Sequence, residues 1–224
     1  SFFSEAVEAA KQSELVIAAI GERASMSGED ASRADISIPG VQEELVQALL
    51  DTGKPVVVVL MNGRPLTISK LTEQVPAIVE GWFLGTETGN AIADVLLGKY
   101  NPSGKLTMSF PRNVGQIPVF YNYRQSGRPG TDKLTKWTNR FIDSPVSPLY
   151  PFGYGLSYTT FSYSAPRVSQ KEFSANEILK VSVDVTNTGQ YDGEETIQLY
   201  IRDVIASVTR PVKELKGFKK IFLR

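Results

Sequence analysis

Two glutamates, Glu22 and Glu29, lie in a glycine-containing segment that directly follows a short apolar run. The segment, residues 21–30, reads Gly-Glu-Arg-Ala-Ser-Met-Ser-Gly-Glu-Asp. A carboxyl group on such a loop can donate a proton to a departing oxygen or take one from water. Gly28, directly before Glu29, permits a backbone conformation that other residues resist. The pattern therefore predicts an acid-base site with Glu29 as the catalytic acid.

Other interpretations of these acids remain open. From its position alone, Glu29 is more simply a solvated loop carboxylate or a residue that interacts with a helix dipole. Glu22 lies closer to the end of the apolar run, where it could orient the loop. Asp30 and Asp35 fit the roles of helix caps or arginine partners.

Composition excludes several function classes. The 224 residues contain 24 Lys and Arg against 24 Asp and Glu, so the net charge is zero and no basic stripe favours nucleic acid. Cysteine and histidine are both absent, which excludes disulfides, thiol nucleophiles, histidine bases and the common histidine metal sites within this chain. No apolar run approaches the roughly 20 residues that span a bilayer. Acid-base chemistry therefore falls to carboxylates, lysine or tyrosine. We expect that the chain requires no metal or organic cofactor.

The first half of the chain alternates between strand and helix patterns. The continuously apolar run 15–20 predicts a strand buried on both faces of a parallel sheet. Further strands are predicted at 55–61 and 77–82, with a helix opened by Pro39 and ending near Gly53 and another at 89–97. This succession indicates a mainly parallel sheet sandwiched by helices. Ligands usually bind at the carboxyl ends of such strands, where Glu29 lies.

The second half follows different patterns. A short strand is predicted at 106–110, and then an ordered surface excursion at 111–151 that is rich in Pro, Gly and aromatic residues. After residue 158 the period becomes two, as in the alternation of 179–186, and the last run, 218–223, is also strand-like. We expect an α/β domain at 1–158 and an antiparallel β-sandwich domain at 159–224.

Several strings, taken in order, resemble the C-terminal half of bacterial β-glucosidases of glycoside hydrolase family 3. They are Gly28-Glu29, Leu60-Met61-Asn62-Gly63-Arg64-Pro65-Leu66, Gly81-Trp82-Phe83-Leu84-Gly85-Thr86-Glu87, Asn101-Pro102-Ser103-Gly104-Lys105-Leu106 and Tyr150-Pro151-Phe152-Gly153-Tyr154-Gly155-Leu156-Ser157-Tyr158. The resemblance covers the whole chain and is strongest to the periplasmic type with a fibronectin type III-like tail.

The resemblance implies a retaining exo-β-glycosidase that acts on oligosaccharides or aryl β-glycosides in the periplasm or outside the cell. Glu29 matches the family's general acid/base. The family's nucleophile is an aspartate of a Ser-Asp-Trp-type motif on an N-terminal barrel domain, and no such motif occurs here. We therefore expect a fragment that is inactive alone, with a fibronectin type III-like domain that lacks its last strands.

Aromatic residues could complete the sugar site. Trp137 and Phe141, in the excursion, are candidates for rim contacts with substrate, although packing against the barrel explains them equally well. Trp82 lies in an apolar run and is more simply a core residue. Asn62-Gly63-Arg64 could form the floor of the pocket or a structural turn.

Two rival functions come from other classes. The tail and the aromatic excursion would also fit a non-catalytic carbohydrate-binding or adhesion module. The parallel sheet would fit a flavodoxin-like nucleotide binder, but no convincing phosphate loop follows the first strand.

Overall fold

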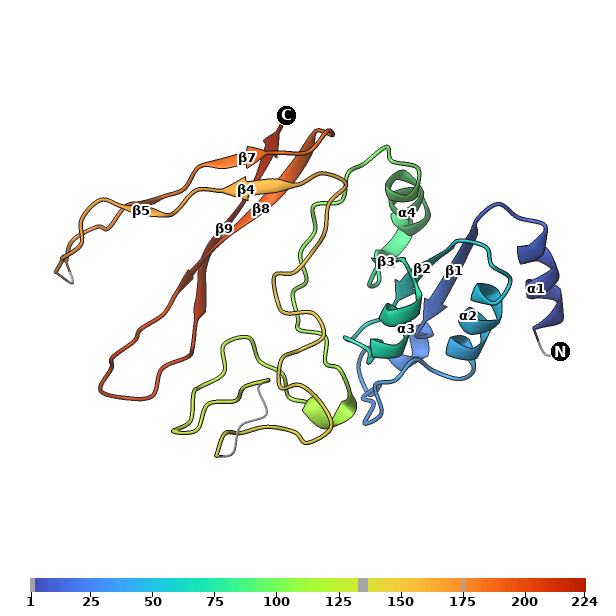
Figure 1. The fold of residues 1–224 in the computed structure, drawn as a ribbon, viewed down its shortest axis with the longest axis horizontal. Helices are drawn as coiled ribbons and strands as arrows, with labels where there is room; N and C mark the ends of the chain where they lie inside the picture. Colours follow the sequence, from blue (N-terminus) through green and yellow to red (C-terminus); the bar gives the residue numbers. More distant parts are fainter. Residues whose placement is uncertain (1–2, 133–136, 175) are drawn as a thin grey trace.

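A three-stranded parallel sheet forms the centre of the first half of the chain. The computed structural model describes residues 3–132, 137–174 and 176–224. Strands β1 (Val16–Gly21), β2 (Val56–Met61) and β3 (Ala77–Glu80) lie side by side in the order β1-β2-β3 (Figure 1). All three predicted strands are confirmed, although β3 ends at Glu80, two residues before Trp82.

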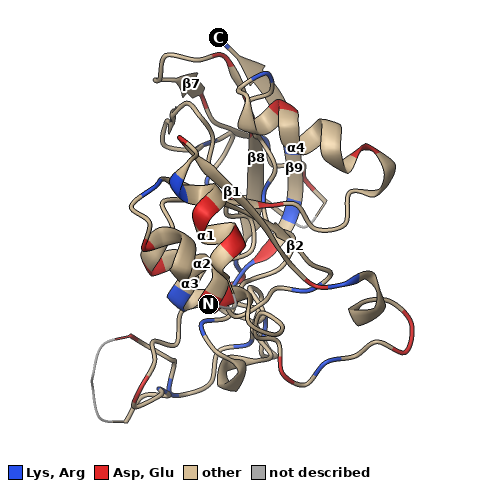
Figure 2. Ribbon diagram, turned by 90° about the vertical axis from the view of Figure 1, so that its right-hand side faces the viewer, with Lys and Arg blue, Asp and Glu red and all other residues tan. Residues whose placement is uncertain are grey.

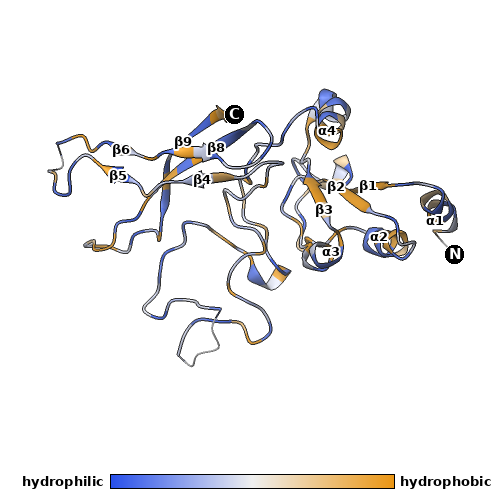
Figure 3. Ribbon diagram, turned by 45° about the horizontal axis from the view of Figure 1, so that its top comes forward, coloured by the Kyte–Doolittle hydropathy of each residue, from blue (hydrophilic) through white to orange (hydrophobic). Residues whose placement is uncertain are grey.

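Helices cover both faces of this sheet. They are α1 (Ser4–Lys11), α2 (Gln42–Leu50), α3 (Ser69–Gln74) and α4 (Thr88–Leu96). Figures 1 and 3 place α2 and α3 against one face and α4 against the other. The predicted α2 begins at Gln42 and not at Pro39, because Gly40 has φ +66° and turns the chain first. The sequence patterns did not predict α1 and α3.

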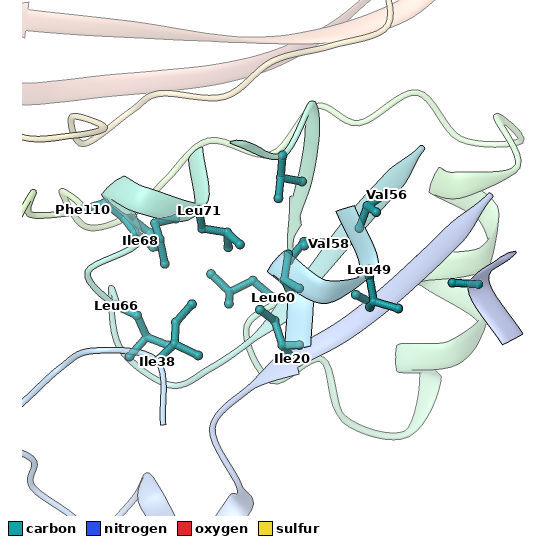
Figure 4. Close-up of a cluster of buried hydrophobic side chains, with 14 residues drawn as sticks. Ile20, Ile38, Leu49, Val56, Val58, Leu60, Leu66, Ile68, Leu71 and Phe110 are labelled. Carbon is teal, nitrogen blue, oxygen red and sulfur yellow. The ribbon is translucent and has the colours of Figure 1, made fainter. Parts of the chain in front are cut away.

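The hydrophobic core lies between the sheet and the α2 and α3 face. Val56, Val58, Leu60 and Leu66 are fully buried there, and Phe110 closes one end (Figure 4). Hydropathy colouring in Figure 3 shows the same concentration of apolar residues along β1, β2 and β3. Burial of this kind contributes about 25 cal/mol for each Å² of apolar surface.

The expectation that the first strand is buried on both faces is wrong. Ala18 and Ile20 point into the core, whereas Ile17 on the opposite face of β1 is 53% exposed. On that face α4 lies over the β2 and β3 side, where Ile92 approaches Gly81. The apolar run of β1 is therefore covered on one face only within the described residues.

The predicted strand at 106–110 does not form as a strand. Phe110 makes a single antiparallel bridge to Tyr150. Leu106 makes two backbone hydrogen bonds, each of 2.7 Å, one from its own N to Tyr154 O and one from Gly153 N to its own O. These contacts hold the two ends of the excursion together. The excursion contains one turn of 3-10 helix, at Val114–Gln116, and its residues 133–136 lie outside the described residues.

The tail is antiparallel, as predicted. Its pairs are β4 (Phe161–Tyr163) with β7 (Val185–Asn187), β5 (Arg167–Val168) with β6 (Val181–Ser182), and β8 (Gly193–Ile201) with β9 (Glu214–Leu223). The alternating run 179–186 is divided between β6 and β7, because its two halves pair with different strands.

Charged residues of both signs are interspersed over both halves of the chain (Figure 2). None of the described helices is long and apolar enough to cross a membrane.

Candidate functional site

The segment that follows β1, residues 22–35, is the loop that carries the predicted acid, and we call it the β1 loop. Glu22 is its first residue, and its side chain is fully buried. The Glu22 carboxylate accepts hydrogen bonds from Arg33 Nη1 at 2.7 Å, from Gly63 N at 3.0 Å and from Ser27 Oγ at 3.2 Å. Glu22 thus joins both ends of the β1 loop to the turn after β2.

Arg64 provides the second attachment of the β1 loop. Its guanidinium donates to the carbonyl oxygen of Met26, to Ser27 Oγ at 3.2 Å and to the carbonyl oxygen of Ala31 at 2.8 Å. The same guanidinium lies 3.1 Å from the Glu22 carboxylate. The loop is therefore tied down on both sides of residues 28–30.

Electrostatics at the base of the loop favour an ionised Glu22. Burial alone would raise the pKa of Glu22, but hydrogen bonds from Arg33, Gly63 and Ser27 and the charge of Arg64 outweigh it. The pKa of this carboxyl consequently lies below its usual value. An anion so held is an anchor for the loop rather than a proton donor.

Glu29 lies at the tip of the β1 loop, with an exposed side chain. Its neighbours have unusual backbone angles, φ +113° at Gly28 and φ +60° at Asp30. Within the described parts of the chain, no hydrogen bond or ion pair joins the Glu29 carboxyl to another residue. The loop therefore presents a free carboxyl from an anchored base, as a proton donor to a separately bound molecule requires.

A hollow of about 820 Å³ lies beside the base of the loop. The ends of β1 and β2, the β1 loop and the segment after β3 contribute to its lining, which includes Gly21, Arg23, Met26, Met61 and Phe83. Glu29 is not among the lining residues.

Two further polar side chains, Asn62 in the turn after β2 and Glu80 at the end of β3, lie at the same edge of the sheet. Asn62 is completely buried, and Glu80 pairs in register with Leu60. Burial raises the pKa of Glu80 to about 7, although hydrogen bonding to Trp82 N and the Asn62 side chain opposes the effect. The sequence patterns had not singled out Glu80. Its only signal was an acid at the end of an apolar strand.

The predicted rim aromatics do not line the hollow beside the base of the β1 loop. Trp137 is 77% exposed, and the guanidinium carbon of Arg128 lies 5.8 Å from the centre of its ring. Phe141 lines a separate hollow of about 230 Å³, with Arg140 and Asp143 among its other walls. Trp82 packs on the core, 5.7 Å from Phe110 between ring centres, as its apolar surroundings predicted.

Among the described residues, no group of three or more acidic side chains is placed to hold a metal ion. The site consists of one exposed carboxyl, Glu29, above a buried network of ion pairs and hydrogen bonds.

Comparison with known families and proteins gives a consistent result. The model of the glycosyl hydrolase family 3 C-terminal domain matches residues 1–158, and that of a fibronectin type III-like domain matches residues 195–224. A periplasmic β-glucosidase of Salmonella typhimurium is 54% identical over 100% of this chain and 29% of its own length. A β-xylosidase of Formosa agariphila is 50% identical over 99% of this chain and 30% of its own length.

Solved structures show the same relationship. A β-glucosidase from Listeria innocua, crystallised with gluconolactone, superposes with a TM-score of 0.94 and 44% identity over 99% of this chain and 31% of its own. A β-glucosidase from Erythrobacter marinus gives a TM-score of 0.90 at 41% identity. The chain spans about 30% of the length of the relatives it matches.

Proposed function

The chain belongs to glycosyl hydrolase family 3, and from that premise we propose that it is part of a retaining exo-β-glycosidase with β-glucosides as its first substrate class. The activity belongs to a longer polypeptide, of which the chain supplies the general acid/base. The observation that carries this proposal is the position of Glu29, a free carboxyl at the tip of a loop anchored by Glu22 and Arg64. A β-xylosidase among the relatives makes β-xylosides the second class to assay.

The chemistry needs two carboxyl groups roughly 5–5.5 Å apart. In the first step the nucleophile attacks the anomeric carbon while Glu29 protonates the departing glycosidic oxygen. In the second step the Glu29 carboxylate takes a proton from water, which then displaces the sugar from the enzyme. We place the nucleophile, an aspartate, on an N-terminal barrel domain of the same polypeptide, which would close a sugar pocket over the β1 loop.

Other features of the enzyme follow from the same proposal. Trp137 and Phe141 are the aromatic side chains that we assign to the rim of the leaving-group site. The division into an α/β domain at 1–158 and a fibronectin type III-like domain at 159–224 remains part of the proposal. The named relative in Salmonella typhimurium supports a periplasmic or secreted location.

The full-length enzyme with Glu29→Ala tests the assignment. General acid assistance contributes about 10²- to 10⁴-fold, and substrates with poor leaving groups depend on it most. The variant should therefore lose far more activity on alkyl or disaccharide β-glucosides than on dinitrophenyl β-glucoside. Added azide should restore turnover of the activated substrate and yield a β-glycosyl azide.

Asp30→Asn is the matched control, because it removes a charge from the neighbouring position and asparagine tolerates the left-handed backbone there. This control should keep the wild-type dependence on the leaving group. If Glu22→Ala gives the azide product and Glu29→Ala does not, the wrong glutamate has been assigned.

A further inference from the structure

The stretch of chain that carries Glu29 is fixed in the core at both of its ends. Ile20, directly before Gly21, and Ile38, directly before Pro39, are both buried in the hydrophobic core (Figure 4). Glu29 lies between these two points. A contact that joins the backbone at Gly21 and Pro39 therefore limits how far the intervening residues can move.

Gln42 makes this contact through one side-chain amide. Its Oε1 accepts the backbone N–H of Gly21 at 2.8 Å, and its Nε2 donates to the carbonyl oxygens of Gly21 at 2.9 Å and of Pro39 at 2.7 Å. The reverse orientation of the amide would set its N–H groups against the N–H of Gly21 and its oxygen against two carbonyl oxygens. The three partners therefore fix a single orientation of the Gln42 amide.

Helix α2 directs this side chain toward the sheet. Gln42 is the first residue of α2, and Val46 and Leu49 further along the helix are buried in the core. Residues at this spacing share one face of a helix. Gln42 is thus a polar residue on the core-facing side of a helix whose place is fixed by packing.

The Gln42 amide also occupies the outer edge of β1. The N–H of Glu22 turns toward β2 and donates to the carbonyl oxygen of Met61 at 2.8 Å, so the N–H and C=O of the preceding Gly21 point away from β2. Among the described residues, β1 pairs with β2 alone. Gln42 supplies Gly21 with one acceptor and one donor, as a neighbouring strand would. The backbone at which the β1 loop begins is therefore held on both sides.

Gly21 connects Gln42 to the anchor of the β1 loop. Glu22 follows Gly21 directly, and its carboxylate accepts hydrogen bonds from Ser27 and Arg33 within the loop. A shift of the Gly21 backbone would therefore move the carboxylate that holds the loop.

A role in ligand binding explains Gln42 less well. Its side chain is among those that line the hollow beside the base of the loop, but both N–H groups of the amide are already donated to backbone oxygens. The amide is thus engaged with the protein itself.

We propose that Gln42 is a positioning residue for Glu29: its amide fastens Gly21 to Pro39 and so sets the base from which the β1 loop presents the acid. This inference rests on the proposed function of Glu29. Without the amide, one N–H and two carbonyl oxygens lose their partner, and the loop is no longer closed at its base.

The test is Gln42→Leu in the full-length enzyme, because leucine fills a similar space and makes none of the three hydrogen bonds. The variant should lose roughly 10- to 100-fold in kcat/KM on β-glucosides with poor leaving groups and much less on dinitrophenyl β-glucoside, since a displaced acid affects the acid-dependent step alone. An equal loss on both substrates would show a purely structural role and overturn the proposal.

Gln47→Leu is the matched control on the same helix, because the Gln47 amide bonds with the side chains of Asp51 and Gln74. This control should keep wild-type kcat/KM on both substrates, within about twofold. A loss in Gln47→Leu that matches the loss in Gln42→Leu would also overturn the proposal.

Hydrogen exchange of the full-length enzyme, resolved to single amides and normalised to intrinsic rates, supplies a readout that does not depend on activity. In the wild type the amide of Gly21 should exchange far more slowly than that of Glu29 at the exposed tip of the loop. In Gln42→Leu, exchange should rise at Gly21 and through residues 22–31, whereas Gln47→Leu should leave it unchanged.

A wild-type Gly21 amide that exchanges as fast as that of Glu29 overturns the proposal even if Gln42→Leu fails to fold. Failure of the proposed function is a separate result, namely an unchanged leaving-group dependence in Glu29→Ala. The exchange comparison would still decide whether Gln42 holds the loop.

Discussion

Glu22 and Glu29 are separated by six residues, yet their surroundings give them opposite roles. Glu22 is buried against two arginines, each less than one-fifth exposed, while Glu29 is exposed and unpaired within the described chain. A buried, paired carboxylate contributes to folding, and its loss leaves uncompensated charges behind. An exposed carboxyl on an anchored loop contributes little to folding and is free for chemistry.

Glu22→Gln should therefore destabilise the protein by about 3 kcal/mol, because Arg33 and Arg64 lose their anionic partner. Urea unfolding at neutral pH measures this difference. Glu29→Gln, the matched control on the same loop, should change the free energy of unfolding little. Equal effects of the two variants would contradict the anchoring role of Glu22.

The contribution of Glu22 to the free energy of unfolding changes with pH in a defined direction. Its pKa is lower in the folded state than the usual 4.5, so its contribution is present above that value and is lost as the pH falls through the folded pKa. Glu22→Gln should accordingly show a smaller loss of stability on acidification than the wild type.

At the scale of elements, the backbones of β1 and β2 lie in tight contact where the β1 loop leaves the sheet. Gly21 has φ +136°, and a Cβ at this position would overlap the carbonyl oxygen of Met61. The backbone N–H of Glu22 donates to the same carbonyl at 2.8 Å. The close approach requires glycine and places the buried carboxylate of Glu22 directly after it.

Gly21→Ala should lower the free energy of unfolding by about 2 kcal/mol or more, because both the backbone angle and the backbone contact must change. Gly89→Ala is the matched control. Gly89 lies in α4, and a Cβ there would meet nothing within 4 Å. Alanine at this helical position should instead stabilise the protein by roughly 0.5–1 kcal/mol. Thermal unfolding of the two variants separates these outcomes.

At the scale of the whole molecule, a buried charge joins the two halves of the chain. Glu195, on β8, is 7% exposed and lies 3.2 Å from Lys105 Nζ. It also accepts a 2.7 Å hydrogen bond from the hydroxyl of Tyr163, and Lys105 donates to the carbonyl oxygen of Gly155 at 2.9 Å. Burial and the hydrogen bond to Glu195 raise the pKa of Tyr163, so its hydroxyl stays protonated as a donor.

Glu195→Leu should uncouple the two halves, because Lys105 loses its buried partner while the strands of each half keep their own hydrogen bonds. We expect calorimetric unfolding to change from one transition to two, or to broaden markedly. Glu214→Leu, which removes a pair with the more exposed Lys216, is the control and should leave the transition unchanged. A single sharp transition in Glu195→Leu would show that other contacts couple the halves.

Local patterns were enough to predict much of this architecture. The apolar runs of β1, β2 and β3, the helical spacing of apolar residues in α2 and the alternation in the tail are local signals, and each produced the expected type of element. The helices α1 and α3 were missed because they are short and contain few large apolar residues: the apolar residues of α1 are alanines and one valine, and that of α3 is one leucine. The strand expected at 106–110 failed because strand formation requires pairing over several consecutive residues, whereas only its two ends, Leu106 and Phe110, make backbone hydrogen bonds to the segment 149–154.

The sequence by itself determined that an acid would lie on a glycine-containing loop at the carboxyl end of a strand, and its motifs identified the family. Only the tertiary structure decided which carboxylates are buried and what they contact. Glu22, Asn62 and Glu80 lie up to 58 positions apart and meet because parallel pairing aligns the ends of three strands. Burial, ion pairing and the raised pKa of Glu80 all depend on that alignment, since desolvation is set by neighbours in space and not by neighbours in sequence.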